Sequence, residues 1–270
     1  MTTNFDASAP AARQTAAGVS APEAAGAMRR GPGRTPIPLQ EVLVSVLIPV
    51  YNEVRTVEDL VATVHAAPFR KELICVDDAS TDGTGDVLRR LVESGRINRL
   101  IRHPRNRGKG ASVRSALTVS TGNIVVVQDA DLEYDPSDWP QLFEPIIDGR
   151  ADAVFGSRFL AGPHRVLYYW HSVGNRLLTT LSNMLTNLNL TDMETCYKAV
   201  RGEIARSLPL SSERFGFEPE LTARLSKAGV RIYEVPISYA GRTYAEGKKI
   251  GWRDGVAALW HIVFYNLLSR

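Results

Sequence analysis

The sequence predicts an α/β fold in which helices cover both faces of a mostly parallel sheet. From Glu41 onward, short apolar runs rich in β-branched residues alternate with stretches of helical spacing, which is typical of parallel strands joined by helices. Hydrophobic residues make up 44% and charged residues 23% of the chain, as in ordinary globular proteins. Its 270 residues suit one large domain or two small ones.

The alternation begins with a buried strand at 42–50 and a helix at 57–67. The helix is predicted because Val57, Leu60 and Val64 recur on one face. The elements that follow are a strand at 72–76, a helix at 86–93, a strand at 97–101, a helix at 111–119 and a strand at 124–127.

After about Asp129 the alternation becomes irregular. We expect further strands at 152–156 and 231–235, and a helix within 166–190, a segment with unusually few charges. No internal repeat is visible. The predicted organisation is a main domain at 41–250 followed by an amphipathic helix at 251–270.

The first 40 residues are rich in Ala, Pro, Gly, Ser and Thr, with Phe5 as their only aromatic residue. Such a stretch buries too little apolar surface to offset its ordering entropy, so we predict a disordered tail at 1–40. It contains a basic cluster of Arg29, Arg30 and Arg34. Two interpretations stay open, an extension without function and an arm attracted to a membrane.

Charge and cysteine content narrow the functional classes. Lys and Arg number 32 against 29 for Asp and Glu, and a net charge of +3 is too small for a dedicated nucleic-acid binder. Cys75 and Cys196 form no disulfide framework and lack metal-ligand spacing. No apolar run is long enough to cross a bilayer, and the N-terminus lacks a secretory pattern. We therefore expect a protein of the cytoplasm.

The first chemically informative motif is Asp129-Ala130-Asp131, directly after the strand at 124–127. Ligands of parallel sheets bind beyond the carboxyl ends of the strands. Two carboxylates at i and i+2 can reach one ion, and oxygen-only ligands favour Mg²⁺ or Mn²⁺ shared with substrate phosphates. Glu133 continues the spacing as a candidate third ligand. The alternative is a surface turn, which often contains this pattern.

Three further polar clusters are predicted at the same edge of the sheet. Asp77-Asp78 ends one strand, where a carboxylate can bind the ribose or base of a nucleotide, and 49–53 ends the first strand. The segment 106–110 precedes a helix, where Lys109 and open helix N–H groups suit phosphate. Each cluster alone can be ordinary loop chemistry. Four of them in this order predict a nucleotide site.

Four motifs carry a family resemblance: Val-Leu-Ile-Pro-Val-Tyr-Asn-Glu (46–53), Val-Asp-Asp-Ala-Ser-Thr-Asp-Gly-Thr (76–84), Asn-Arg-Gly-Lys-Gly (106–110) and Asp-Ala-Asp-Leu-Glu (129–133). Together they resemble family 2 glycosyltransferases over about residues 42–250. This resemblance implies a GT-A fold and inverting transfer from a UDP- or GDP-linked sugar. Gly-Ser-Arg-Phe (156–159) narrows it to the dolichyl- and polyprenyl-phosphate sugar transferases, the branch of dolichol-phosphate mannosyltransferase.

The resemblance also implies roles for individual residues. Those expected at the nucleotide are Pro49, Tyr51, Glu53, Asp78, Lys109, Asp129 and Ala130. Asp129 and Asp131 would engage the donor diphosphate through Mg²⁺ or Mn²⁺, with Asp131 as the key ligand. The branch often has Gln where this chain has Glu133, which leaves that residue's role open.

The acceptor decides what else the site needs. A lipid phosphate is largely ionised at neutral pH, with a second pKa of about 6, so it needs positioning cations more than a base. By resemblance, Arg158 and Arg176 would lie near the acceptor phosphate and Arg242 near the donor. Each arginine alone is more typical of a solvated surface. Arg242 lies near the start of a segment, 241–249, that resembles a mobile lid.

A hydroxyl acceptor would instead need a carboxylate to take its proton. Asp192 and Glu218 are the candidate bases, and Glu194 and Glu220 are also available nearby. The alternative for Glu218 and Glu220 is a helix start with first-turn acids, with Pro219 at the first helical position.

Two segments are apolar and aromatic without being able to span a bilayer. Between Val166 and Thr191 the only formally charged residue is Arg176, and 256–268 has apolar residues at helical spacing. Tyr and Trp favour the membrane interface, so we predict peripheral contact with the inner face of the cell membrane. The alternatives are a core helix and a dimer-forming tail, which would make a homo-oligomer.

Two other classes of function are less consistent with the sequence. A dinucleotide-binding dehydrogenase needs Gly-x-Gly-x-x-Gly after the first strand, where this chain has 49–53 instead. A non-catalytic sugar-nucleotide sensor would not need intact acidic motifs. The resemblance implies a metal-dependent glycosyltransferase that acts on polyprenyl phosphate, and a saccharide or other hydroxyl acceptor is the alternative.

Overall fold

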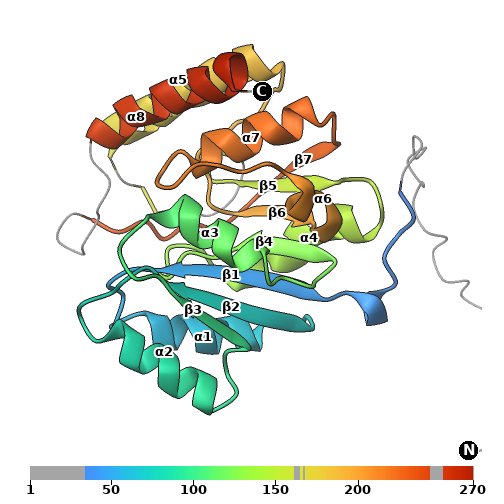
Figure 1. Cartoon of the computed structure of the whole chain (residues 1–270). Coiled ribbons are helices and arrows are strands. Elements are labelled where there is room, and N and C mark those ends of the chain that lie inside the picture. The colour runs from blue at the N-terminus through green and yellow to red at the C-terminus, as the bar shows by residue number, and fades with distance from the viewer. Residues whose placement is uncertain (1–33, 161–164, 167, 244–251, 270) are drawn as a thin grey trace, which may run out of the picture. The chain divides into compact units, whose positions relative to one another are not determined.

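The computed structural model describes residues 34–160, 165–166, 168–243 and 252–269. In this part of the chain, seven strands form one sheet in the order β3-β2-β1-β4-β6-β5-β7 (Figure 1). The strands are β1 (Val44–Val50), β2 (Lys71–Asp77), β3 (Arg99–Arg102), β4 (Ile124–Val127), β5 (Ala153–Ser157), β6 (Lys198–Arg201) and β7 (Ile232–Pro236). The predicted α/β class and mostly parallel sheet are confirmed.

Strand direction brings the polar motifs to one edge of this sheet. β6 runs antiparallel to its neighbours β4 and β5, whereas the other paired strands are parallel. The carboxyl ends of β1, β2, β4 and β5 therefore meet at the same edge, together with the start of β6. Loops that follow four strands and precede a fifth can contribute side chains there.

Helices connect and cover the strands. They are α1 (Val57–Ala66), α2 (Thr84–Glu93), α3 (Lys109–Leu117), α4 (Trp139–Ile147), α5 (Tyr169–Thr186), α6 (Gly202–Ser207), α7 (Phe217–Lys227) and α8 (Trp252–Val263). A π-helical turn (Phe264–Leu268) continues α8, and short 3₁₀ turns lie at Leu39–Glu41 and Pro136–Asp138. Figure 1 shows α5 and α8 side by side beyond α7.

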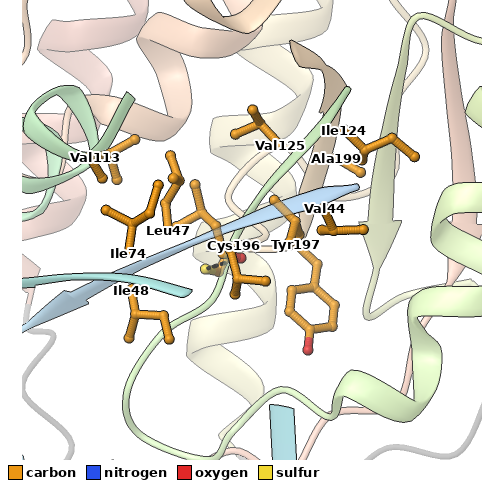
Figure 2. Close-up of a cluster of buried hydrophobic side chains, with 14 of the residues drawn as sticks. Val44, Leu47, Ile48, Ile74, Val113, Ile124, Val125, Cys196, Tyr197 and Ala199 are labelled. Carbon is orange, nitrogen blue, oxygen red and sulfur yellow. Dashed lines mark hydrogen bonds between the residues drawn. The ribbon is translucent and has the colours of Figure 1, made fainter. Parts of the chain in front are cut away.

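The core lies between the sheet and its helices because the central strands are apolar on both faces. Val44, Leu47 and Ile48 of β1 are fully buried. Figure 2 shows how they converge with side chains from β2, α3, β4 and β6. Truncating one such aliphatic side chain to Ala costs about 2–5 kcal/mol of stability, so this packing holds the edge loops in place.

The structure departs from the predicted elements mainly after β4. The sequence analysis did not anticipate β6, whose Lys198 and Arg201 are buried, or helices α4 and α6. It also placed the end of the disordered tail at residue 40, whereas Arg34 already pairs with Asp152 at 2.7 Å. Residues 1–33 of the predicted tail lie outside the described residues.

Candidate active site

Arg242 is the centre of the acidic cluster that follows β4. Its guanidinium lies 3.1 Å from Asp131, 3.3 Å from Glu133 and 3.5 Å from Glu53. Leu132 has a positive φ of 62°, which turns the chain so that the backbone N–H of Glu133 donates to Asp131. Arg242 comes from the segment after β7, so the site joins the first loop, the Asp-x-Asp loop and the C-terminal part of the sheet.

Asp131 has more negative charge around it than the single positive charge of Arg242 can neutralise. Burial raises its pKa, and the charges of Asp129 and Glu133 raise it further, to about 7, although Arg242 opposes them. A divalent cation would relieve this repulsion, and carboxylate oxygens are the donors that Mg²⁺ and Mn²⁺ prefer. The donor chemistry of Asp129 and Asp131 therefore fits such an ion.

Glu133 has a different environment from the two aspartates. Its Oε2 accepts from the Tyr239 hydroxyl at 2.6 Å, and its Oε1 accepts from the Arg242 backbone N–H at 3.0 Å. Within the described ranges, no three acidic, His or Cys side chains converge as a metal-binding group. The role of Glu133 as a third metal ligand stays a prediction.

Lys109 links the Asp-x-Asp motif to the start of α7. Its Nζ lies 2.8 Å from a carboxylate oxygen of Asp129 and 2.8 Å from one of Glu218. Burial alone would lower the pKa of Lys109, but the charges of these two carboxylates hold it well above its usual value. The ammonium is therefore a fixed positive charge beside the motif.

Asp78 is turned inward, where it organises the loop that carries Lys109. The backbone N–H groups of Arg107 and Gly108 donate to its carboxylate at 2.9 and 2.6 Å, and Nδ1 of His103 lies 2.7 Å away. Gly108 has a φ of +92°, a conformation that glycine adopts without strain. In this structure Asp78 shapes the loop that carries Lys109, and its role at the nucleoside stays a prediction.

The other residues predicted at the nucleotide occupy three kinds of position. Tyr51 is exposed beyond the end of β1, and Pro49 is half-buried within that strand. Ala130 is buried, and its carbonyl accepts from the hydroxyl of Thr56 at 2.7 Å. Glu53 is the member of this group that reaches the Arg242 cluster.

Arg158 and Asp192 form a buried pair on the β5 side of the edge. Nε and one terminal nitrogen of Arg158 donate to the two oxygens of Asp192 at 2.6 and 2.7 Å. Burial alone would raise the pKa of Asp192, but Arg158 lowers it below its usual value. An anion held this firmly is a weak proton acceptor, which disfavours Asp192 as a base.

Helix α5 contacts this pair through Asn175, a residue that the sequence analysis missed. The Asn175 amide oxygen lies 3.4 Å from Arg158, and its amide nitrogen lies 3.3 Å from Asp192. The predicted neighbour, Arg176, points its side chain to solvent, and no ion pair forms between it and the described residues. Sequence spacing could not reveal which of two adjacent residues faces the site, since that depends on the rotation of α5.

The second candidate base, Glu218, is the second residue of α7 and pairs with Lys109. Glu220 accepts from the backbone N–H groups of Ser211 and Ser212, so it holds the loop before the helix. The interpretation of these acids as a helix start is thus supported. Pro219, however, occupies the third helical position rather than the first.

The surface formed by α5 and α8 is apolar. Its most exposed large side chains on α5 are Tyr169, Trp170, Leu177 and Met184, and on α8 Val256 and Trp260. The buried residues of α5 are instead Thr179, Ser182 and Thr186. Among the described residues, no helix is long and apolar enough to cross a membrane. Of the predicted lid at 241–249, residues 244–249 lie outside the described ranges.

Comparisons with known proteins agree on one family. The model of glycosyl transferase family 2 matches residues 45–208. The undecaprenyl-phosphate mannosyltransferase of Micrococcus luteus is 30% identical over 234 residues, covering 83% of this chain and 94% of that protein. The polyprenol monophosphomannose synthase of Mycolicibacterium smegmatis is also 30% identical, covering 84% of this chain and 88% of that protein.

A solved structure matches the fold over most of the chain. It is glucosyl-3-phosphoglycerate synthase from Mycobacterium tuberculosis, in complex with Mn²⁺, UDP and glucosyl-3-phosphoglycerate. The TM-score is 0.65 at 21% identity, and the match covers 84% of this chain and 81% of the other.

Proposed function

This chain belongs to glycosyl transferase family 2 and is a glycosyltransferase, and we propose that it transfers a sugar from a nucleotide donor to a polyprenyl phosphate. The transfer would take place at the cytoplasmic face of a membrane and depend on Mg²⁺ or Mn²⁺. Both cysteines are free and buried, which is consistent with a reducing compartment.

One observation carries the choice of acceptor. Asn175 joins the Arg158–Asp192 pair to α5, the helix that exposes Trp170 and Leu177. The ion pair at the edge of the sheet therefore contacts the same helix that presents apolar side chains to solvent on another face. A lipid phosphate has the matching chemistry, an anionic head on an apolar chain. The named acceptors of the two curated relatives, undecaprenyl phosphate and polyprenol monophosphate, support the same class.

On the donor side, Lys109 and Arg242 supply fixed positive charge next to the predicted diphosphate position. These charges attract the donor before reaction and stabilise the negative charge that grows on the leaving diphosphate. A bound Mg²⁺ or Mn²⁺ would add to that stabilisation. Asp129 and Asp131 are the residues that would hold it.

On the acceptor side, Arg158 would orient the phosphate for attack on the anomeric carbon. Its bidentate pair with Asp192 fixes the guanidinium plane, and one face lies over the Tyr239 ring at 5.2 Å. This rigid support reduces the entropy lost when substrate binds.

The apolar surface would bring the enzyme to its acceptor. Aromatic side chains such as Tyr169, Trp170 and Trp260 favour the interface between lipid headgroups and acyl chains, and a helix pair with one apolar face can lie in that plane. Peripheral attachment then holds the edge of the sheet near the phosphates of the bilayer.

The proposal is tested by incubating the purified protein with a panel of labelled UDP- and GDP-sugars, membrane lipid extract, and either Mg²⁺, Mn²⁺ or a chelator. We expect label in a mild-acid-labile lipid fraction, with one donor preferred and no transfer in the chelator. Metal-dependent donor hydrolysis without lipid labelling would contradict the acceptor assignment and favour a hydroxyl acceptor. Equal transfer in the chelator would contradict the metal.

A further inference from the structure

Tyr239 lies between the two arginines that the proposed function assigns to the donor and to the acceptor. Its hydroxyl donates to Oε2 of Glu133 at 2.6 Å, and Glu133 in turn contacts Arg242. Its ring faces the guanidinium of Arg158, with 5.2 Å between the guanidinium carbon and the ring centroid. One side chain from the segment after β7 therefore contacts both halves of the site.

The Glu133 carboxylate uses both of its oxygens to hold the segment that carries Arg242. Oε1 accepts from the backbone N–H of Arg242 at 3.0 Å and lies 3.3 Å from Nε of the same residue, whereas Oε2 accepts from Tyr239. The Glu133 carbonyl oxygen also accepts from the backbone N–H of Ala240 at 3.0 Å. The segment 239–242 is thus wrapped around Glu133.

The direction of the Arg242 guanidinium depends on the orientation of that carboxylate. The last torsion of a glutamate side chain has no sharply preferred value, so a carboxylate bonded on one side only can rotate. The Tyr239 hydroxyl removes this freedom from Glu133, because it holds the second oxygen. Burial raises the pKa of Tyr239, and Glu133 raises it further, so the hydroxyl stays protonated and remains a donor. With Nε of Arg242 held by Glu133, a terminal nitrogen lies 3.1 Å from Asp131, a residue proposed to hold the metal at the diphosphate.

Contacts outside the two arginines set the position of Tyr239. Its ring packs against the buried ring of Tyr134, with the ring centroids 5.3 Å apart. The preceding residue, Ser238, donates from its backbone N–H and its hydroxyl to Asp138, at 2.8 and 2.7 Å. The Tyr239 carbonyl oxygen also accepts from the backbone N–H of Arg165 at 3.0 Å. Loss of the Tyr239 hydroxyl should therefore leave the backbone of this segment in place.

Building on the proposed function, we propose that Tyr239 is a positioning residue for sugar transfer. Through Glu133, its hydroxyl directs Arg242 toward the donor diphosphate, and its ring supports Arg158 at the acceptor phosphate. Tyr239 acts through these two arginines and takes no part in making or breaking bonds. The hydroxyl therefore matters for the donor and the ring for the acceptor, and two substitutions separate these contributions.

The test measures kcat and the donor and acceptor KM for the wild type, Tyr239→Phe and Tyr239→Leu, with polyprenyl phosphate in detergent and saturating Mg²⁺ or Mn²⁺. Tyr239→Phe removes only the hydroxyl, so kcat/KM for the donor should fall about tenfold or more, while the acceptor KM stays within about twofold. Tyr239→Leu also removes the ring, so the acceptor KM should additionally rise about threefold or more.

A double-variant cycle separates this route from a general loss of structure. Because the hydroxyl acts through Arg242, Tyr239→Phe should change the donor kcat/KM less than about twofold in the Arg242→Gln background. A general loosening would instead lower it by the same factor in both backgrounds. Tyr265→Phe, in the turn after α8, is the matched control and should leave each kinetic constant within about twofold. Its ring also faces an arginine, Arg224, at 5.9 Å, and its hydroxyl lies 3.4 Å from that of Ser211.

Three results would overturn the inference. They are a donor kcat/KM of Tyr239→Phe within about twofold of the wild type, an equal factor of loss in the Arg242→Gln background, and an acceptor KM that Tyr239→Leu leaves unchanged. Each of these still shows wild-type transfer to lipid and leaves the proposed function intact. A wild type that labels no polyprenyl phosphate with any donor contradicts the proposed function itself, and the role of Tyr239 falls with it.

Discussion

The carboxyl edge of the sheet and the α5–α8 surface differ in the side chains that they present: the edge presents ion-paired charges and the α5–α8 surface presents apolar groups. At the edge, Asp131, Asp129 and Asp192 each have a cationic partner in Arg242, Lys109 and Arg158. On α5 the usual pattern of a surface helix is reversed. Trp170 is 77% exposed, whereas Ser182 is 1% exposed. The first region matches a charged, water-soluble ligand and the second an apolar one.

Helix α2 shows what an ordinary surface helix in this protein looks like. It buries Val87, Leu88 and Leu91 and exposes charged residues such as Arg89. Since α5 departs from this pattern, folding alone does not explain its sequence. Under the proposed function, donor chemistry and acceptor delivery lie in different regions, so substitutions should affect them separately.

The largest effect is expected at the edge. Asp131→Asn removes a carboxylate proposed to hold the metal, so transfer should fall at least about 10³-fold with every acceptor, lipid-borne or soluble. Asp135→Asn is the matched control, because its exposed carboxylate instead accepts from Ser137 and should leave the rate unchanged. The measurement is label transfer at saturating donor and metal. Normal activity in Asp131→Asn would remove the metal motif from the mechanism.

Arg158→Gln should have the next largest effect. It deprives the acceptor phosphate of its proposed cation, so the acceptor KM should rise about tenfold or more, while the donor KM changes little. It also leaves Asp192 buried without its ion-pair partner, which should cost about 3–5 kcal/mol of stability. Steady-state kinetics measure the acceptor and donor KM, and thermal unfolding measures the loss of stability.

Arg150→Gln is the control for that substitution. Arg150 pairs with Asp148 and Glu144, away from the edge, so its loss should change neither KM and only slightly lower stability. An unchanged acceptor KM in Arg158→Gln would limit that residue to a structural role.

A smaller and more selective effect is expected on the apolar surface. The double variant Trp170→Ser, Leu177→Ser should bind vesicles about tenfold more weakly, because two exposed apolar side chains are lost. Transfer should fall with polyprenyl phosphate in vesicles and stay normal with a short-chain acceptor in solution. Cosedimentation measures vesicle binding, and the two transfer assays measure the activity with each acceptor. Val92→Ser on α2 is the control. Equal losses of transfer with the vesicle-bound and the soluble acceptor would contradict a separate role of the apolar surface in acceptor delivery.

The smallest predicted effect is on stability, at Glu194. Because the fold raises the pKa of this carboxyl from its ordinary value near 4.5 to about 7, folding opposes its ionisation. The native state then binds more protons than the unfolded state between these values, so stability falls as pH rises through this range. Glu194→Gln should unfold a few degrees higher than the wild type at pH 8 and at nearly the same temperature at pH 4. Thermal unfolding scans of both proteins at pH 8 and pH 4 test this prediction. A Tm of Glu194→Gln below that of the wild type at pH 8 would contradict the raised pKa.

The sequence was most informative where burial follows a simple pattern. β1 and β4 are almost wholly apolar and β2 contains the apolar run 73–76, so both their positions and the edge loops after them could be predicted. β6 could not, because its four residues include Lys198 and Arg201, whose burial depends on carbonyl oxygens of the preceding loop and of Ile146 in α4. Tertiary partners, rather than local preference, make this strand.

Within the site, the same limit separates what was and was not foreseen. Local motifs revealed Asp129, Asp131 and Lys109, but not that Arg242 would gather three carboxylates from two distant loops. Nor could spacing show that Asn175 faces Arg158. These contacts depend on how β7 and α5 are placed against the sheet, which no short stretch of sequence encodes.

The most direct test of the account compares two acceptors that differ in one group. The purified protein, its preferred labelled donor and Mg²⁺ or Mn²⁺ are incubated with polyprenyl phosphate or with the corresponding polyprenol in the same vesicles. We predict label only on the phosphate, in a product that mild acid releases. Equal labelling of the polyprenol, or transfer only to soluble hydroxyl compounds, would contradict a lipid-phosphate acceptor.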